Sequence, residues 1–364
     1  MSLRCGIVGL PNVGKSTIFN AITQAGAKSA NFPFCTVEPN VGRVDVPDPR
    51  LNKLAELVEP ERIVPAFTEF VDIAGLVEGA SKGEGLGNKF LSHIRETQAV
   101  AHVVRCFEDD NIIHVRGKVD PLDDIRIINM ELILADMDSL EKQLHSLDKK
   151  GRSGDKQAKA QHEIGARILK HLEEEKPLRT MEMSEDERPL AALFHLITEK
   201  PVLYVANVSE NDAASGNEFS RKVEDYAKKE GAPLVLICGS IEEETAVLDE
   251  KERNEFLQSI GLEETGLNRM IRASYALLDL ITFFTAGEVE VRAWTVKKNS
   301  TAPEAAGVIH SDMERGFIRA EVTAYEDVIS FGSLTRAREA GKMRLEGKEY
   351  IIKDGDVCYF RFNV

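Results

Sequence analysis

The chain lacks a cysteine framework and any long apolar run. Its five cysteines are scattered singly along 364 residues with no C-x-x-C pair, which argues against a disulfide scaffold or a cysteine zinc site. No apolar stretch is long enough to cross a bilayer, and the first residues show no signal-peptide pattern. We therefore expect a cytoplasmic protein in a reducing compartment, with no membrane partner.

Positive charge is also scarce. The 46 lysines and arginines are outnumbered by 61 aspartates and glutamates, which gives a formal net charge of −15. Such a charge excludes a protein that coats nucleic acid with its whole surface, so no DNA partner is expected and any RNA contact must be local. The length and the 43% hydrophobic content are typical of a soluble globular protein with two or three domains.

The most specific pattern lies near the N-terminus. Residues 9–16 read Gly-Leu-Pro-Asn-Val-Gly-Lys-Ser and match the phosphate-binding pattern G-x-x-x-x-G-K-[ST], between an apolar run and a helical stretch. In such a loop the backbone N–H groups surround the phosphates, the lysine reaches the β- and γ-phosphates, and the serine hydroxyl binds Mg²⁺. An ordinary glycine-rich turn is the alternative. The predicted nucleotide-binding residues here are Asn12, Val13, Gly14, Lys15, Ser16 and Thr17.

Two further features supply parts of a phosphoryl-transfer site. Asp72-Ile73-Ala74-Gly75 ends an apolar strand, where the carboxylate suits the Mg²⁺ shell and the Gly75 N–H suits the γ-phosphate. Thr36 lies between the two motifs, where its hydroxyl is expected to complete the Mg²⁺ coordination only while the γ-phosphate is present. The predicted metal ligands are therefore Ser16, Thr36 and Asp72, and Lys15 and Gly75 are predicted to act in catalysis.

The order of apolar and helical stretches predicts the fold. Apolar runs alternate with helical patterns such as 219–229, which is typical of an α/β domain with a mostly parallel sheet and helices on both faces. Ligands of such sheets bind at the carboxyl ends of the strands, where the phosphate loop lies. The runs are 68–73, 99–107, 201–208 and 233–238.

This alternation stops between about residues 120 and 198. Apolar residues recur at near-helical spacing over 125–147 and again over 164–172, which predicts an inserted, coiled-coil-like helical hairpin. Its turn, residues 149–156 with Lys159, is the most basic local stretch of the chain. Two interpretations stay open for this turn, a solvated tip and a contact with RNA phosphates.

The last part of the chain has a different pattern, with short strands in place of alternating strands and helices. Short strands over 289–296, 317–323 and 357–362, with a helical stretch over 334–340, are separated by Gly, Asp and Pro. This pattern predicts a small separate β-rich domain.

Together the motifs resemble the translation-factor-related G domains of the Obg family, and most closely the YchF subfamily of Obg-like ATPases. The similar segments cover essentially the whole chain and are 31–36, 72–77, 82–88, 292–295 and 316–321. The resemblance implies a P-loop NTPase that hydrolyses ATP and associates with the ribosome. It also implies a domain organisation: an Obg-type G domain over 1–120 and 199–278, the helical insertion over 121–198, and a β-grasp-like TGS domain of the α+β class over 279–364. We expect the TGS domain and the basic turn to contact RNA of the large ribosomal subunit.

The segment Asn207-Val208-Ser209-Glu210 bears on the choice of base. It occupies the position of the N-K-x-D motif with which GTPases of this fold bind guanine. Here Val208 replaces the lysine, and Glu210, with a longer side chain, replaces the aspartate. A carboxylate fixed there would face the N1 acceptor of adenine, whereas Glu210 can move away while Asn207 bonds the N6/N7 edge and Val208 packs on the ring. We predict a preference for ATP over GTP. A GTPase or an unspecific NTPase is the alternative.

The sequence also lacks the usual water-orienting group. Leu76 follows Gly75, whereas Ras-like hydrolases place a glutamine there. His114, in a polar segment after an apolar strand, is the candidate residue for positioning the water, and the alternative is an ordinary surface histidine. Asn12 is of the type that family members use to help hold a monovalent cation, so stimulation by K⁺ is expected.

These features predict a Mg²⁺-dependent ATP-hydrolysing switch that binds the ribosome. A small-molecule kinase with the same phosphate loop is a less favoured alternative, because the chain carries switch-like loops. A third interpretation is a binding scaffold in which hydrolysis is incidental.

Overall fold

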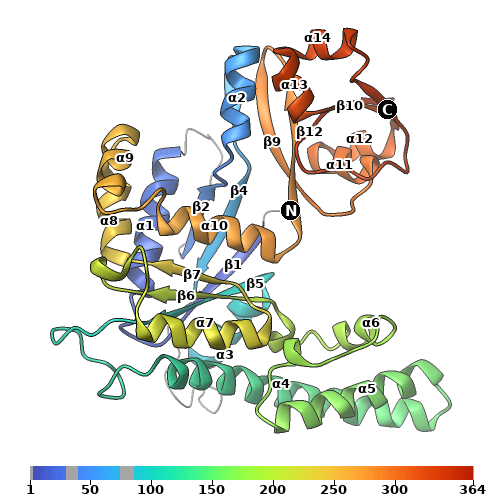
Figure 1. The fold of residues 1–364 in the computed structure, drawn as a ribbon. Helices are drawn as coiled ribbons and strands as arrows, with labels where there is room; N and C mark the ends of the chain where they lie inside the picture. The colour runs from blue at the N-terminus through green and yellow to red at the C-terminus, as the bar shows by residue number, and fades with distance from the viewer. Residues whose placement is uncertain (1–2, 30–39, 74–85, 364) are drawn as a thin grey trace. The chain divides into compact units, whose positions relative to one another are not determined.

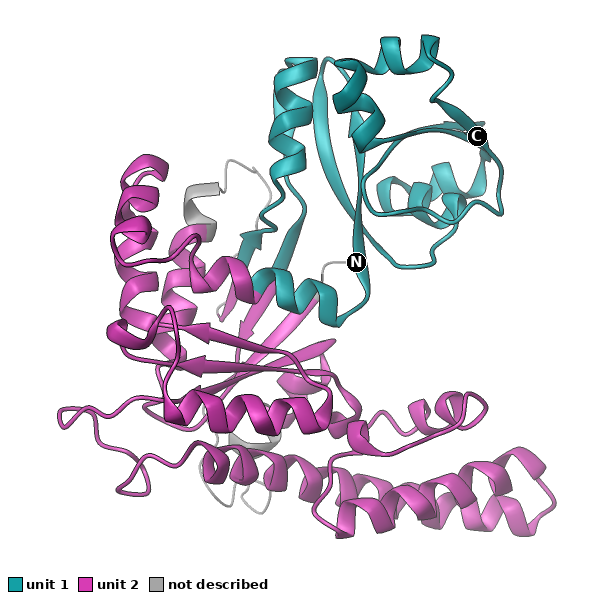
Figure 2. Cartoon of the chain, viewed as in Figure 1, with its two compact units in different colours: residues 1–3, 43–68, 271–364 teal, residues 4–42, 69–270 magenta. Residues whose placement is uncertain are grey.

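The computed structural model describes residues 3–29, 40–73 and 86–363, and its contacts divide the chain into two compact units (Figures 1 and 2). The larger unit comprises residues 4–42 and 69–270, and the smaller unit comprises residues 1–3, 43–68 and 271–364. The boundary passes through three strands and one helix, so both units contain pieces that are distant in sequence.

The first sheet has the strand order β2-β4-β1-β5-β6-β7. Adjacent pairs among β1, β5, β6 and β7 are parallel, and every residue of β5 and β6 is buried, as expected for strands covered on both faces. This confirms the predicted α/β fold. The strands are β1 (Leu3–Val8), β2 (Val41–Asp45), β4 (Phe67–Asp72), β5 (Ala99–Arg105), β6 (Val202–Asn207) and β7 (Leu234–Ile237).

The helices that accompany this sheet begin and end at recognisable signals. In α7, for example, Asn217 and Ser220 form a reciprocal capping box, and Gly231 ends the helix with φ 68°. These helices are α1 (Lys15–Ser29), α3 (Leu86–Arg95), α7 (Glu218–Glu230), α8 (Gly239–Val247), α9 (Glu250–Ser259) and α10 (Gly266–Leu277), with short 3₁₀ turns η2 (Leu178–Thr180), η3 (Ile197–Glu199) and η4 (Glu210–Asp212).

The predicted helical hairpin is present in the larger unit. It consists of α4 (Pro121–Arg152) and α5 (Lys156–Glu173), which lie side by side (Figure 1), followed by the short α6 (Glu187–Ala192). Asp120 and Asp155 cap the two long helices by accepting N–H groups of their first turns. The two helices and the segment that follows them share one hydrophobic core. It consists of Ile133, Leu140, Leu144, Ile164, Ile168, Leu172, Leu178, Ala191, Phe194 and Leu196.

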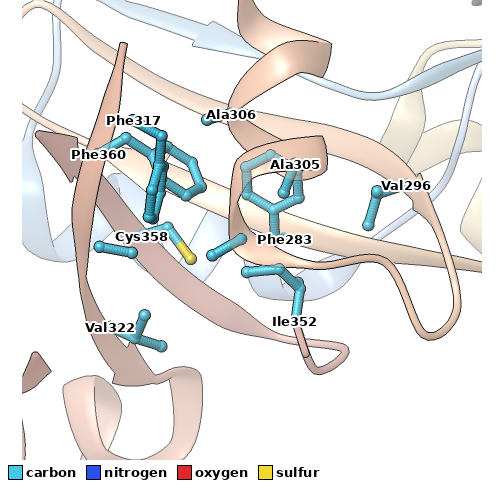
Figure 3. Close-up of a cluster of buried hydrophobic side chains, with 11 residues drawn as sticks. Phe283, Val296, Ala305, Ala306, Phe317, Val322, Ile352, Cys358 and Phe360 are labelled. Atoms are coloured by element: carbon cyan, nitrogen blue, oxygen red, sulfur yellow. The ribbon is translucent and has the colours of Figure 1, made fainter. Parts of the chain in front are cut away.

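The smaller unit is built on a second sheet of order β11-β10-β12-β8-β9-β3. Its core brings the rings of Phe283 and Phe360 edge to face, with centroids 5.9 Å apart, beneath Ala305 and Ala306 of α11 (Figure 3). This is the predicted C-terminal α+β structure. The elements are α2 (Pro49–Val58), β3 (Arg62–Val64), β8 (Leu280–Ala286), β9 (Glu290–Lys297), α11 (Ala302–Ile309), α12 (Ser311–Arg315), β10 (Phe317–Ala324), α13 (Tyr325–Phe331), α14 (Leu334–Glu339), β11 (Arg344–Glu346) and β12 (Asp356–Phe362).

Residues 43–68 group differently from the sequence prediction, which included them in the G domain. The strand β3 pairs in parallel with β9, and Arg50 of α2 donates to Asp354 at 2.7 Å, so this segment packs with C-terminal residues. A three-residue strand carries too little periodicity to show which sheet edge it joins. The predicted limits of the helical insertion and TGS domains remain predictions.

Two simple observations bear on the predicted class of protein. Among the residues that the structure describes, no helix is long and apolar enough to span a membrane. Cys5, Cys106, Cys238 and Cys358 are free thiols and are buried. Cys35 lies outside the described residues.

Candidate nucleotide-binding site

The loop between β1 and α1 has the backbone geometry that phosphate binding requires. Asn12 has φ 62° and Gly14 has φ 93°, two left-handed residues that turn the chain tightly before α1. The first hydrogen bond of the helix runs from the Ile18 N–H to the Gly14 carbonyl, at 3.1 Å. The N–H groups of its first turn therefore have no partner within the helix and are suited to an anion.

A pocket of about 980 Å³ lies at the carboxyl ends of β1, β5, β6 and β7. This is the edge of a parallel sheet at which ligands bind. Four segments, each following one of these strands, supply its walls. They are residues 10–12 and 14–17, residues 107–109 and 112, residues 207–211, and residues 238–240 with Glu243.

Most of the predicted nucleotide ligands therefore meet in one pocket. Val13 is the exception, because its side chain is buried and only its carbonyl is engaged, by the side chain of Asn207. Thr36 and Gly75 lie outside the described residues, so their predicted roles remain predictions.

The predicted metal ligands Ser16 and Asp72 lie beside the phosphate loop. Asp72 ends β4, the neighbour of β1 in the sheet, and its carboxylate forms an ion pair with the Lys15 ammonium. The Ser16 hydroxyl is on the exposed first turn of α1 and has no hydrogen bond to another described residue. A carboxylate and a hydroxyl oxygen available for coordination fit the oxygen ligands that Mg²⁺ prefers.

At the other end of the pocket, Asn207 joins two loops. Its amide donates to the Val13 carbonyl at 2.9 Å and accepts the Gly239 N–H at 3.1 Å. One N–H and one oxygen lone pair of the Asn207 amide remain for a ligand. The Glu210 carboxylate accepts a hydrogen bond of 2.9 Å from the Ser240 hydroxyl, which follows β7.

His114 lies in different surroundings from those the water-positioning hypothesis expects. It lines a separate hollow of about 280 Å³ with Asp120 and Asp124, and not the pocket above. Its Nδ1 accepts the Arg116 N–H at 3.2 Å, so Nε2 carries the proton and donates to Asp124 at 3.1 Å. Both ring nitrogens are thus engaged, and a role in orienting water requires the loop to rearrange.

Some pocket residues were not identified from the sequence. The sequence pattern places the end of the apolar run at Phe107, whereas β5 ends at Arg105. Phe107 therefore looks like part of the strand, and neither it nor Ile112 is predicted to line the pocket. Ser240 lies at the start of α8, just after β7, the last parallel strand. The rule that strand ends of a parallel sheet meet at one edge was the available signal for it.

Glu242 is a buried carboxyl group one turn into α8, the helix whose first residues line the pocket. It accepts the N–H groups of Gly266 at 2.7 Å and Leu267 at 3.1 Å, and so caps α10. Burial raises the pKa of Glu242 from its ordinary 4.5 to about 7, and the two backbone hydrogen bonds only partly oppose this shift.

We expect Glu242 to make the protein less stable as the pH rises from about 4.5 to about 7. In that window the folded state holds a proton that the unfolded state has lost, so the free energy of unfolding falls by up to about 1.4 kcal/mol per pH unit and then levels off. Urea unfolding of the wild type and of Glu242→Gln at pH 5, 6, 7 and 8 isolates this contribution. Parallel stability curves for the two proteins would contradict the assignment.

Family models match both ends of the chain. A model described as "50S ribosome-binding GTPase" matches residues 4–135, and the model YchF-GTPase_C, described as "Protein of unknown function (DUF933)", matches residues 280–363. The first match contains the phosphate loop and β4, and the second covers most of the second sheet.

Full-length relatives are also similar. The "Ribosome-binding ATPase YchF" of Bacillus subtilis is 59% identical over 366 residues, and that of Haemophilus influenzae is 59% identical over 364 residues, each covering 100% of both chains. The solved structure titled "Structure of the Schizosaccharomyces pombe YchF GTPase" superposes with a TM-score of 0.90 at 39% identity, over 99% of this chain and 98% of that one. With the phosphate loop, the parallel sheet and these identities over the full length, the chain belongs to the YchF family of P-loop proteins.

Proposed function

We propose that this protein is an ATP hydrolase that works as a nucleotide-dependent switch on the ribosome. The observation that carries the proposal is the pocket at the sheet edge, where the phosphate loop with Lys15 and Ser16 meets the segment 207–211, and where Lys15 is paired with Asp72 of the neighbouring strand. Relatives of 59% identity bear the name ribosome-binding ATPase. We place the activity in the cytoplasm, with the ribosome as partner.

Magnesium is the proposed cofactor. Ser16 and Asp72 would hold it, with Thr36 as a third ligand when the γ-phosphate is present, and the ion would neutralise charge on the β- and γ-phosphates. Potassium is a second proposed cation, near Asn12. The Asn12 amide nitrogen donates to the Ile113 carbonyl at 3.0 Å, and its oxygen accepts no hydrogen bond from the part of the chain that the structure describes, so this oxygen can face a cation.

ATP is the proposed substrate in preference to GTP. The Glu210 side chain is exposed, and one of its carboxylate oxygens already accepts a hydrogen bond from Ser240, so adenine can enter without burying this carboxylate against its N1. The names of the relatives differ on this point, since the Bacillus subtilis relative is called an ATPase and the Schizosaccharomyces pombe structure a GTPase. A GTPase or an unspecific NTPase is therefore the second candidate.

The catalytic group for water remains a proposal. We keep His114 as the candidate, acting after a rearrangement that frees one ring nitrogen from Asp124 or from the Arg116 amide. Lys15 and Gly75 would stabilise the γ-phosphate.

The ribosome contact is proposed to use the hairpin tip and the TGS domain. Lys149, Lys150, Lys156 and Lys159 are exposed at the tip and have no carboxylate partner among the described residues. Arg152, in contrast, is paired with Asp148 at 2.8 Å. Four unpaired ammonium groups on a chain of net charge −15 suit RNA phosphates.

Reversing two of these charges is expected to weaken ribosome binding. Lys149→Glu/Lys150→Glu should raise the dissociation constant about tenfold and flatten its dependence on salt, because two phosphate contacts are lost. Co-sedimentation with 50S subunits at several salt concentrations measures both quantities.

The matched control is Lys228→Glu/Lys229→Glu. These lysines are also adjacent and exposed in the last turn of α7, so the charge and helix-dipole changes are equal. The control additionally loses the exposed ion pair of Lys228 with Glu224, which contributes little to stability. Equal weakening by both double variants would show that net charge, and not the tip, governs binding.

Phosphate release tests the function as a whole. The protein with Mg²⁺ and ATP is expected to release inorganic phosphate with water as the only acceptor, faster with potassium and with ribosomes. Transfer of the γ-phosphate to an added small molecule would favour a kinase. Ribosome binding without any turnover would favour a scaffold.

A further inference from the structure

We infer that Arg105 is a positioning residue that fixes one wall of the nucleotide pocket through backbone carbonyls. This inference rests on the proposed function of the pocket. The wall is the 107–113 loop, which follows β5 and supplies Phe107, Asp109 and Ile112 to the pocket lining.

Arg105 is among the most completely buried large side chains of the chain, with 1% of its surface exposed. Within the described residues it has no carboxylate partner. Its guanidinium instead donates to three carbonyls of the loop: Nε to Phe107 at 3.0 Å, Nη1 to Ile112 at 2.9 Å, and Nη2 to Asp109 at 3.3 Å.

A buried charge of this kind is costly unless it is hydrogen-bonded. Carbonyl dipoles that converge on the guanidinium stabilise it in place of water, and they must be held together for as long as the charge stays buried. The guanidinium needs the three carbonyls, and the same three hydrogen bonds hold the 107–113 loop in its curved path. Lysine has one compact ammonium group and cannot span three carbonyls in the plane of a guanidinium.

The loop contacts both Arg105 and the phosphate loop. The guanidinium carbon lies 4.7 Å from the centre of the ring of Phe107, an aromatic residue of the pocket wall. Ile113, next to the last residue held by Arg105, accepts the hydrogen bond from Asn12 of the phosphate loop at 3.0 Å. Arg105 therefore holds the phosphate loop and the aromatic wall in one arrangement without touching the nucleotide.

The test compares Arg105→Lys with a matched variant, Arg179→Lys. Arg179 lies in the same unit with 11% of its side chain exposed, and its donors go to Glu230, Asn129 and Tyr204, none of which lines the pocket. Both variants replace a largely buried guanidinium with an ammonium group, so a general loss of stability is common to both. Each full-length protein is measured for its thermal midpoint, ATP turnover, ATP affinity by titration, and hydrogen exchange of the 107–118 peptide without nucleotide.

For Arg105→Lys we expect the dissociation constant and KM for ATP to rise about tenfold, with kcat changed less than about threefold. The 107–118 peptide should exchange faster well below the thermal midpoint. Arg179→Lys should keep both the affinity and the exchange of the wild type.

Equal ATP affinity in the two variants, or unchanged exchange of the 107–118 peptide in Arg105→Lys, would overturn the inference. Failure of the wild type to bind ATP would instead refute the proposed function. In that case the exchange data still decide whether Arg105 holds the loop.

Discussion

Ser16→Ala is expected to abolish Mg²⁺-dependent ATP hydrolysis while leaving the fold intact. The Ser16 hydroxyl is exposed and has no partner among the described residues, so its removal breaks no contact that holds the protein together. What it removes is an oxygen at the first turn of α1, beside Lys15 and Asp72, where Ser16 would help to hold the proposed metal and the metal would neutralise charge on the phosphates. We expect kcat to fall by about a hundredfold or more, comparable with the loss of a group that stabilises developing charge.

Phosphate release at saturating Mg²⁺ and ATP measures this effect, and thermal unfolding shows whether the fold is retained. Ser16→Thr is the control, because it keeps a hydroxyl at the same position and the motif accepts either residue. Turnover by Ser16→Ala within a few-fold of the wild type would remove Ser16 from the metal site.

Gly14→Ala is expected to remove nucleotide binding altogether. At φ 93° an alanine is strained, and its Cβ would lie 2.1 Å from the Asn207 amide nitrogen. That amide joins the Val13 carbonyl to the Gly239 N–H, so the clash disturbs the phosphate loop and the base end of the pocket together. We expect at least about a hundredfold weaker ATP binding, or roughly 2.7 kcal/mol.

Gly154→Ala separates the clash from the backbone strain. Gly154 has φ 99°, close to that of Gly14, but lies at the hairpin tip with nothing within 4 Å of its added Cβ. It is expected to lose stability and to keep its ATP affinity, measured by titration in both variants. Wild-type affinity in Gly14→Ala would contradict the structure of the loop.

The sequence predicted those parts of the molecule that follow from local pattern. The phosphate loop, Asp72 at a strand end and the long helices of the hairpin each depend on residues close in sequence. The clustering of Asn12, Lys15, Ser16, Asn207, Val208 and Glu210 also follows, because parallel strands bring their carboxyl ends to one edge.

What the sequence did not predict depends on contacts between distant residues. The pairing of β3 with β9 joins residues more than two hundred positions apart, and no periodicity encodes it. The hydrogen bond from Ser240 to Glu210 and the pairing of His114 with Asp124 are likewise set by the fold. Arg105 was not singled out from the sequence, because its three carbonyl partners lie in a loop whose path only the structure shows.

Calorimetric titration of the wild-type protein with ATP and with GTP, each with excess Mg²⁺, tests the central claim most directly. The account predicts that ATP binds at one site per chain and more tightly than GTP, because Asn207 offers its remaining amide groups while Glu210 is held by Ser240. Equal affinities, or tighter binding of GTP, would contradict the proposed ATP specificity, and no heat of binding with either nucleotide would contradict the site itself.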